Sequence, residues 1–194
     1  DAARGRADHR EQLGFPRLRA LDGLFLDMSI AADALRQRGN LDRERIDISV
    51  RYCTGDAAPK GAAWLFDEQL TPMCSPALVA QSDHALRAPQ DLRHFVLLHL
   101  DDPDNPSAWL SWSTWLDAVG ARGLKSAGSL RFNYFDQIVR AALAGQGVAL
   151  GRLPLVQDLV NDGSLVIPFE TRAPTDRAYW LVKAGFTRGR PDVD

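Results

Sequence analysis

Residues 131–154, RFNYFDQIVRAALAGQGVALGRLP, are the stretch of sequence that decides the fold. Apolar residues recur at 135, 138, 139, 142 and 143, a spacing that places them on one stripe of a helix of about three turns. Gly145 stands where a left-handed residue ends a helix, and residues 147–150 are typical of a short buried strand. Residues 130–132 predict a strand before the helix. A short strand–helix–strand crossover usually joins parallel strands, so the stretch predicts an α/β unit.

The ends of these two strands are the first candidate site. Ligands in open α/β sheets bind at the carboxyl ends of the strands, which here are followed by Asn133, Tyr134 and Phe135 and by Gly151-Arg152. Backbone N–H groups at the start of the predicted helix favour a carboxylate, so the turn at 133–135 predicts a site for a small anionic or zwitterionic metabolite. The alternative is that Asn133 only caps the helix and Phe135 fills the core.

The rest of the chain continues the alternation of strands and helices. Ser75-Pro76 has the residue types preferred at a helix start, and residues 41–45 read as a charged turn. Strands are expected at 23–30, 46–52, 95–100, 165–169 and 177–183, an extended segment at 64–74, and helices at 31–39, 109–119 and 153–160. This order is typical of an α/β fold.

Two extended segments are predicted to pass from one lobe of the domain to the other. Pro72 interrupts the first, at residues 69–72, and the second covers residues 167–174. We therefore expect one lobe to be built from residues 1–70 and 170–194 and the other from residues 71–169. Two crossover strands leave a cleft, a form that binds small ligands and closes by hinging.

The composition of the chain excludes several classes of function. The chain has 194 residues, of which 45% are hydrophobic and 25% charged, as in an ordinary globular protein. A net charge of −2 disfavours DNA binding by this chain alone. No apolar run is long enough to span a membrane, and two cysteines are too few for a disulfide framework, which favours a reducing cytoplasm. The polar residues 1–14 fit a solvated helix, a linker or a disordered lead-in.

The sequence shows neither a nucleophile–base arrangement nor a set of metal ligands. Cys53 and Cys74 read as small buried residues rather than reactive thiols, and the four histidines lack metal-ligand spacing. Ser75 reads as a helix cap, because it does not lie in the G-x-S-x-G pattern of a nucleophile. The tryptophans at 64, 109, 112 and 115 read as core residues rather than base-stacking platforms. The sequence predicts a ligand-binding domain without a cofactor or metal, and not an enzyme.

A family resemblance supports this interpretation. Residues 46–78, IDISVRYCTGDAAPKGAAWLFDEQLTPMCSPAL, are followed in order by LLHLDD, by a helix ending in Trp115-Leu116, by AALAGQGVALGRLPLV and by GSLVIPF. Together these segments resemble the effector-binding domain of LysR-type transcriptional regulators, in the subgroup of the glycine-cleavage activator. The resemblance covers residues 24–184. Cys53 departs from it by replacing a usual glycine, and neither the family's first strand nor its last helix is matched.

The resemblance implies a two-lobed, type 2 periplasmic-binding-protein-like fold with two crossover strands. In that family an N-terminal helix-turn-helix binds DNA. A small effector bound between the lobes changes how the homo-oligomer, a dimer or tetramer, binds that DNA. DNA contact would belong to a domain not in this chain, and no membrane is involved. A solute-binding protein or an enzyme on the same fold is the alternative. The implied effector-binding residues are Tyr52, Cys53 and Thr54 in lobe one, Leu70 and Thr71 at a crossing, and His99, Asn133, Tyr134 and Phe135 in lobe two.

Overall fold

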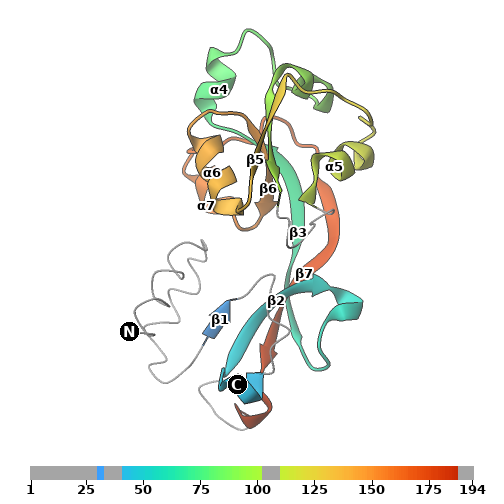
Figure 1. The fold of residues 1–194 in the computed structure, drawn as a ribbon, viewed down its shortest axis with the longest axis vertical. Coiled ribbons are helices and arrows are strands. Elements are labelled where there is room, and N and C mark those ends of the chain that lie inside the picture. Colours follow the sequence, from blue (N-terminus) through green and yellow to red (C-terminus); the bar gives the residue numbers. More distant parts are fainter. Residues whose placement is uncertain (1–29, 33–40, 102–109, 188–194) are drawn as a thin grey trace. The chain divides into compact units, whose positions relative to one another are not determined.

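The computed structural model describes residues 30–32, 41–101 and 110–187 (Figure 1). Predictions for the polar lead-in at 1–14, for most of the strand at 23–30, for residues 33–39 of the helix, for Trp109 and for the chain end therefore lie outside the described residues. The chain divides into two compact units. Unit 1 comprises Asp1–Glu68 and Asp176–Asp194, and unit 2 comprises Gln69–Thr175. The lobe boundaries drawn from the sequence remain a prediction.

Unit 1 is built around strand β2, Ile48–Thr54, which pairs in parallel with β1, Ile30–Ala32, and antiparallel with β7, Ala173–Lys183. Two expectations were wrong here. Residues 31 and 32 continue a strand instead of opening a helix, and the supposed charged turn contains the short helix α3, Leu41–Glu44. The buried Leu41 anchors that helix, and Arg45, at φ 56°, ends it. The single-turn helices η1, Gly55–Ala57, and η4, Gly185–Thr187, complete the described part of the unit.

Unit 2 contains the strand–helix–strand arrangement predicted from residues 131–154. Strand β4, Val96–Leu100, is parallel both to β5, Gly128–Phe132, and to β6, Val148–Leu153. Helix α6, Phe135–Leu143, connects β5 to β6, and Gly145 follows it at φ 72°, as expected of a left-handed helix end. The prediction for this stretch is confirmed.

Strands β3, Ala63–Met73, and β7 are the two elements that run from one unit into the other. The first predicted crossing, residues 69–72, lies within β3, which pairs antiparallel with β6. The strand predicted at 165–169 is wrong, because Val166 makes only an isolated bridge to Cys74. Pro168 cannot donate a backbone hydrogen bond, which explains why pairing stops there. The second crossing is β7 itself, which begins at Ala173, near the end of the predicted segment 167–174.

Two hydrophobic clusters cover the two faces of the sheet in unit 2. Helices α6 and α7, Gln157–Asn161, lie on one side of the strands and α5, Trp112–Ala118, on the other (Figure 1). Both buried indoles of α5 donate to strand carbonyls: Trp112 Nε1 to Leu98 O at 2.9 Å and Trp115 Nε1 to Leu70 O at 3.2 Å. Core packing is therefore confirmed for these two tryptophans, but Trp64 is 55% exposed and its assignment to the core was wrong.

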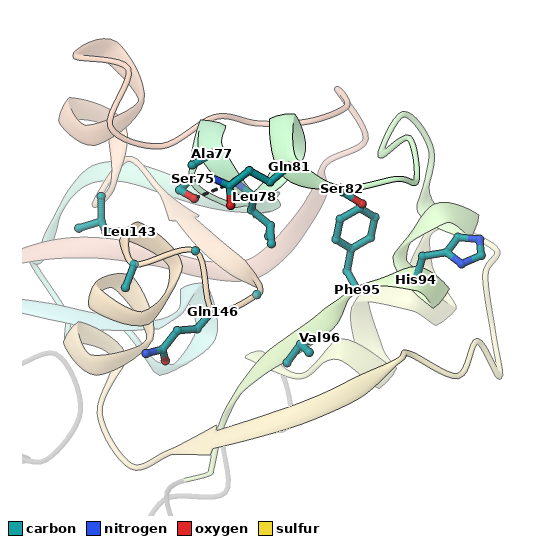
Figure 2. Close-up of a pocket in the computed structure, with 13 residues that line it drawn as sticks. Ser75, Ala77, Leu78, Gln81, Ser82, His94, Phe95, Val96, Leu143 and Gln146 are labelled. Atoms are coloured by element: carbon teal, nitrogen blue, oxygen red, sulfur yellow. Dashed lines mark hydrogen bonds between the residues drawn. The ribbon is translucent and has the colours of Figure 1, made fainter.

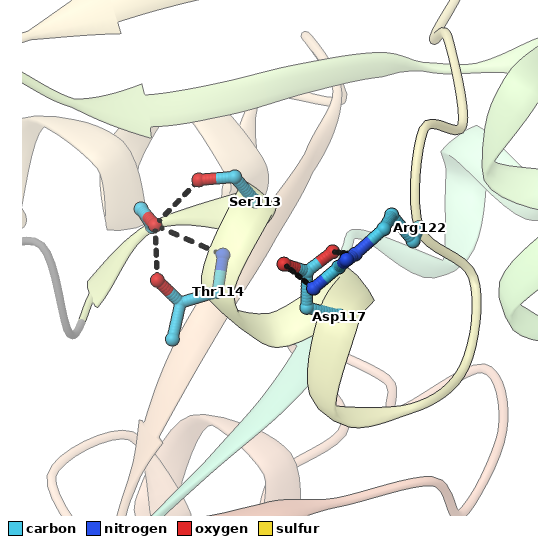
Figure 3. Close-up of polar contacts among 5 residues, drawn as sticks. Ser113, Thr114, Asp117 and Arg122 are labelled. Carbon is cyan, nitrogen blue, oxygen red and sulfur yellow. Dashed lines mark hydrogen bonds and ion pairs between the residues drawn. The ribbon is translucent and has the colours of Figure 1, made fainter.

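Side-chain caps fix the beginnings of two helices in unit 2. Ser75 Oγ accepts from the backbone N–H of Leu78 at 3.2 Å, and Pro76 opens α4, Pro76–Gln81, as predicted. Ser111 Oγ accepts from the N–H of Thr114 at 3.1 Å and caps α5 in the same way (Figure 3). A 3-10 helix, η2, Pro89–His94, leads into β4.

Candidate functional site

One edge of unit 2 gathers six of the nine predicted site residues. Strands β4, β5 and β6 all end at this edge, and β3 enters the unit there, because it is antiparallel to β6. We call residues 69–71, 99–101, 132–135 and 151–154 the carboxyl edge. It includes Leu70, Thr71, His99, Asn133, Tyr134 and Phe135.

The turn into α6 presents side chains to solvent. Asn133 is exposed, and Tyr134 is 61% exposed. Tyr134 occupies the N-cap position with extended backbone, and no side chain caps the helix. The alternative in which Asn133 caps the helix is therefore wrong. Phe135 is half-buried and packs against both hydrophobic clusters, so its role in the core is confirmed.

Thr71 carries a buried polar atom without a partner. Its side chain is 0% exposed, and within the described part of the chain Oγ1 makes no hydrogen bond. A buried hydroxyl left unpaired costs about 1–3 kcal/mol. Thr71 pairs with Gly151 across β3 and β6, where a Cβ at position 151 would lie 2.8 Å from Met73 Sδ. The Met73 side chain fills that space, so any side chain at position 151 would have to displace it.

His99 lies on β4 opposite Arg131 of β5 and is half-buried. Burial lowers the pKa of His99, the charge of Arg131 lowers it further, and Asp101 opposes them. Asp101 also accepts from Arg131 NH1 at 3.4 Å, in an exposed pair. His99 is thus neutral at neutral pH, able to donate from one ring nitrogen and accept at the other.

The three predicted residues of unit 1 are the last three of β2 rather than part of the following loop. Tyr52 is buried, and its hydroxyl donates to Glu68 Oε2. Tyr179 donates to the other carboxylate oxygen, Oε1, at 3.1 Å. We call Tyr52, Glu68 and Tyr179 the tyrosine–glutamate cluster. It gives the Tyr52 hydroxyl a partner inside unit 1.

Both cysteines are free thiols. Burial is the main cause of the raised pKa of Cys53, against the opposing charges of Arg177 and Arg51. Burial also raises the pKa of Cys74 to about 11. Reactive cysteines have a lowered pKa, so neither thiol is of that kind. Cys74 is buried as predicted, whereas Cys53 is only half-buried.

Comparison with known proteins identifies the family. Residues 25–191 match the family model described as the LysR substrate binding domain. The chain belongs to this family.

Relatives and structures agree with the family match. The glycine cleavage system transcriptional activator of Escherichia coli K12 is 26% identical over 167 residues, 86% of this chain and 52% of that protein. The regulator DsdC of the same strain is 34% identical over 132 residues, 67% of this chain and 42% of that one. The effector domain of AmpR from Pseudomonas aeruginosa is 28% identical, with a TM-score of 0.63 over 89% of this chain and 80% of that domain.

This LysR domain has the type 2 periplasmic-binding-protein-like fold, as the sequence resemblance implied. The chain spans about half the length of the curated relatives that it matches. The family is one of regulators, not of enzymes, which removes the enzyme alternative. No helix among the described residues is long and apolar enough to cross a membrane, and those residues contain no group of three or more side chains suited to a metal ion.

Two features of the LysR domain escaped the sequence-based list of site residues. Glu68, at the centre of the tyrosine–glutamate cluster, gave no local signal because its partners are distant in sequence. Arg152 did give a signal, as the only charged residue of β6, whose six residues are all buried. Its guanidinium carbon lies over the ring of Phe135, 5.6 Å from the centroid.

An open pocket lies at the opposite end of unit 2, beside the amino ends of β4 and β6 (Figure 2). Its volume is about 530 Å³. Figure 2 shows the side chains of His94 and Gln146 pointing away from one another, so the polar groups do not converge on one ligand. None of the predicted site residues lines this pocket.

Proposed function

We propose that this LysR domain senses a small anionic or zwitterionic metabolite, which binds at the carboxyl edge. The observation that carries the proposal is the start of α6 at Tyr134, which has no side-chain cap and whose own aromatic side chain is 61% exposed. The first N–H groups of a helix lack partners within it, and the helix dipole attracts negative charge. A carboxylate bound there would accept hydrogen bonds from these N–H groups and would be attracted by the helix dipole.

The charges around the edge support an anion more than a cation. Arg152 and Arg131 contribute positive charge, and His99 offers a neutral donor. Of the acidic groups, Asp101 is paired with Arg131 and Asp136 lies in the first turn of α6. A zwitterion would place its carboxylate near the helix start and its ammonium near Asp136. The name of one relative, an activator of the glycine cleavage system, favours a small amino acid or a related carboxylate as the first ligand to test.

The proposed setting is a bacterial regulator in the cytoplasm, acting as a homodimer or tetramer. The two free cysteines suit a reducing compartment. DNA would be held by a domain outside this chain, whose own net charge is −2. We therefore expect the purified chain to give no discrete complex with duplex DNA in a gel shift at physiological salt. A specific band would contradict this division of roles.

Thermal-shift screening with glycine, L-serine, pyruvate and succinate tests the proposed site. A ligand at about 100 times its dissociation constant adds about 2.7 kcal/mol to stability, which is a readily measured shift. We expect at least one probe to stabilise the chain and the double variant Asn133→Ala/Tyr134→Ala to lose that response. Trp64→Ala is the matched control, since it also removes an exposed aromatic but lies in unit 1. An unchanged response in the double variant would contradict the assignment.

A further inference from the structure

We infer that strand β3 contains a one-residue hinge, Gln69, which lies between two clamped residues, Glu68 in unit 1 and Leu70 in unit 2. The division between the two compact units passes between Glu68 and Gln69. A hinge is usually a few residues that absorb the change in backbone angles between more rigid parts. The inference goes beyond the proposed function, because it concerns where the domain bends and does not depend on which ligand binds.

The clamp in unit 1 is the tyrosine–glutamate cluster. Glu68 is 1% exposed, and its two carboxylate oxygens accept from Tyr52 of β2 and from Tyr179 of β7. These two tyrosines pair across the β2–β7 ladder with ring centroids 4.9 Å apart, and Phe66 of β3 packs on Tyr179 with centroids 4.7 Å apart. One carboxylate therefore joins three strands. A change in the backbone angles at Glu68 would break hydrogen bonds to a charged group, which are among the stronger ones in proteins.

The clamp in unit 2 acts on the residue after Gln69. The carbonyl of Leu70 accepts from Trp115 Nε1 of α5 at 3.2 Å, and the Leu70 side chain is 3% exposed in a core cluster that also contains Trp115. The ladder between β3 and β6 starts at the pair of Gln69 with Leu153 and continues to Met73. From Leu70 onward, β3 is therefore held by both a helix and a strand of unit 2.

Gln69 is the residue between the two clamps. Its side chain is exposed, and its Oε1 accepts from Arg172 NH1 at 3.4 Å, which is long for a hydrogen bond. Gln69 also forms the first pair of the β3–β6 ladder, and the ends of ordered elements open at lower free energy than their interiors.

Strand β7, the other strand that runs between the units, has anchors that lie further apart. Ala173 is buried in the core of unit 2, and the ladder with β2 starts at Arg177. The unit boundary passes between Thr175 and Asp176, inside this longer stretch. Because β3 has one residue between its clamps and β7 has several between its anchors, β3 sets the position at which the domain bends.

Hydrogen exchange of the backbone amides of residues 66–71, measured by NMR in wild type, Tyr179→Phe and Trp115→Phe, tests the inference. Each rate is compared with the rates at Leu97 and Leu98 in the interior of β4, which report global unfolding. We expect Gln69 to be the least protected of the six amides in wild type. Tyr179→Phe removes a bond to the Glu68 carboxylate and should speed exchange about 10-fold or more at residues 67 and 68 only. Trp115→Phe should speed it about 5-fold at residues 70 and 71 only.

Trp64→Phe is the matched control on the same strand, because that exposed indole donates to Asp67 and to neither clamped residue. It should leave exchange at residues 68–71 as in wild type. Tyr52→Phe removes the other bond to Glu68 and should act on the same amides as Tyr179→Phe, should that variant fail to fold. A rise spread evenly over residues 66–71 in the clamp variants would show a purely structural role and overturn the inference. Wild-type protection at Gln69 equal to that of its neighbours would overturn it as well.

Discussion

The tyrosine–glutamate cluster of unit 1 and the carboxyl edge of unit 2 both bury a charged residue, but they satisfy it differently. Glu68 is 1% exposed and accepts from two buried tyrosine hydroxyls of its own unit. Arg152, equally inaccessible, lies where strands end and a helix begins without a cap. The difference separates two uses of a buried charge. Glu68 is held between two hydroxyls of unit 1 and fixes the fold there, whereas Arg152 contacts the ring of Phe135 at a strand end, beside the start of α6.

Removing the centre of the tyrosine–glutamate cluster should have the largest effect. Glu68→Ala leaves the hydroxyls of Tyr52 and Tyr179 buried without their shared acceptor, and each hydrogen bond to a charged group contributes about 1.5–3 kcal/mol. We expect the free energy of unfolding in urea to fall by about 3 kcal/mol or more. Glu170→Ala, at an exposed position, is the control and should change it by less than about 0.5 kcal/mol. Equal losses of unfolding free energy in the two variants would contradict a structural role for the cluster.

Trp115→Phe should have the next largest effect. The indole is 1% exposed and donates to Leu70 O, so the variant loses a hydrogen bond and leaves a small cavity. We expect a loss of about 2 kcal/mol in the free energy of unfolding. Trp64→Phe is matched to it, because that exposed indole donates only to Asp67 at 3.0 Å and should lose about 0.5 kcal/mol or less. A smaller loss at Trp115 than at Trp64 would contradict the anchoring of β3 by α5.

The extent to which the sequence predicted these regions depends on the range of the interactions. The spacing from Phe135 to Gly145 and the pair Ser75-Pro76 are local signals, and both predictions were confirmed. The β2–β7 ladder joins residues more than a hundred positions apart, and no local pattern reveals it. Strand β7 therefore overlaps the predicted second crossing, 167–174, only at the last two residues of that segment.

The same distinction between local and long-range signals applies to the candidate site. The turn at Asn133 and Tyr134 could be found from its position after a strand, and the edge gathers Leu70, Thr71 and His99 around it. Tyr52 was chosen because it stands at the carboxyl end of a predicted strand, a position that cannot show that its hydroxyl has an internal acceptor. Whether any of these residues contacts an effector stays a prediction.

The titration of His99 gives a pH test of the carboxyl edge. Its folded-state pKa lies below the ordinary value of 6.5, so the unfolded chain binds the proton more tightly. Stability should therefore be fully present above pH 6.5 and fall as pH drops from there toward the folded-state pKa. We expect melting temperatures recorded between about pH 7.5 and about pH 5.5 to depend less steeply on pH in His99→Gln than in wild type. The pKa of the exposed His94 is also lowered, by slight desolvation and by the charges of His84 and Arg93, so His94→Gln is the control with the smaller effect. Identical slopes in all three proteins would show that His99 titrates freely.

The smallest effect should come from a charge pair that is neither enclosed nor at the carboxyl edge. Arg122 donates to Asp117 through Nε at 3.0 Å and NH2 at 3.1 Å, with side chains 82% and 44% exposed (Figure 3). The geometry is two-pronged, yet water surrounds both groups, and an exposed pair contributes about 0.2–1 kcal/mol at most. We expect Asp117→Asn to lower the free energy of unfolding by no more than about 0.5 kcal/mol in low salt and by less when salt screens the pair. A loss comparable to that of Glu68→Ala would show that pairing geometry, rather than burial, sets the contribution of charged residues in this domain.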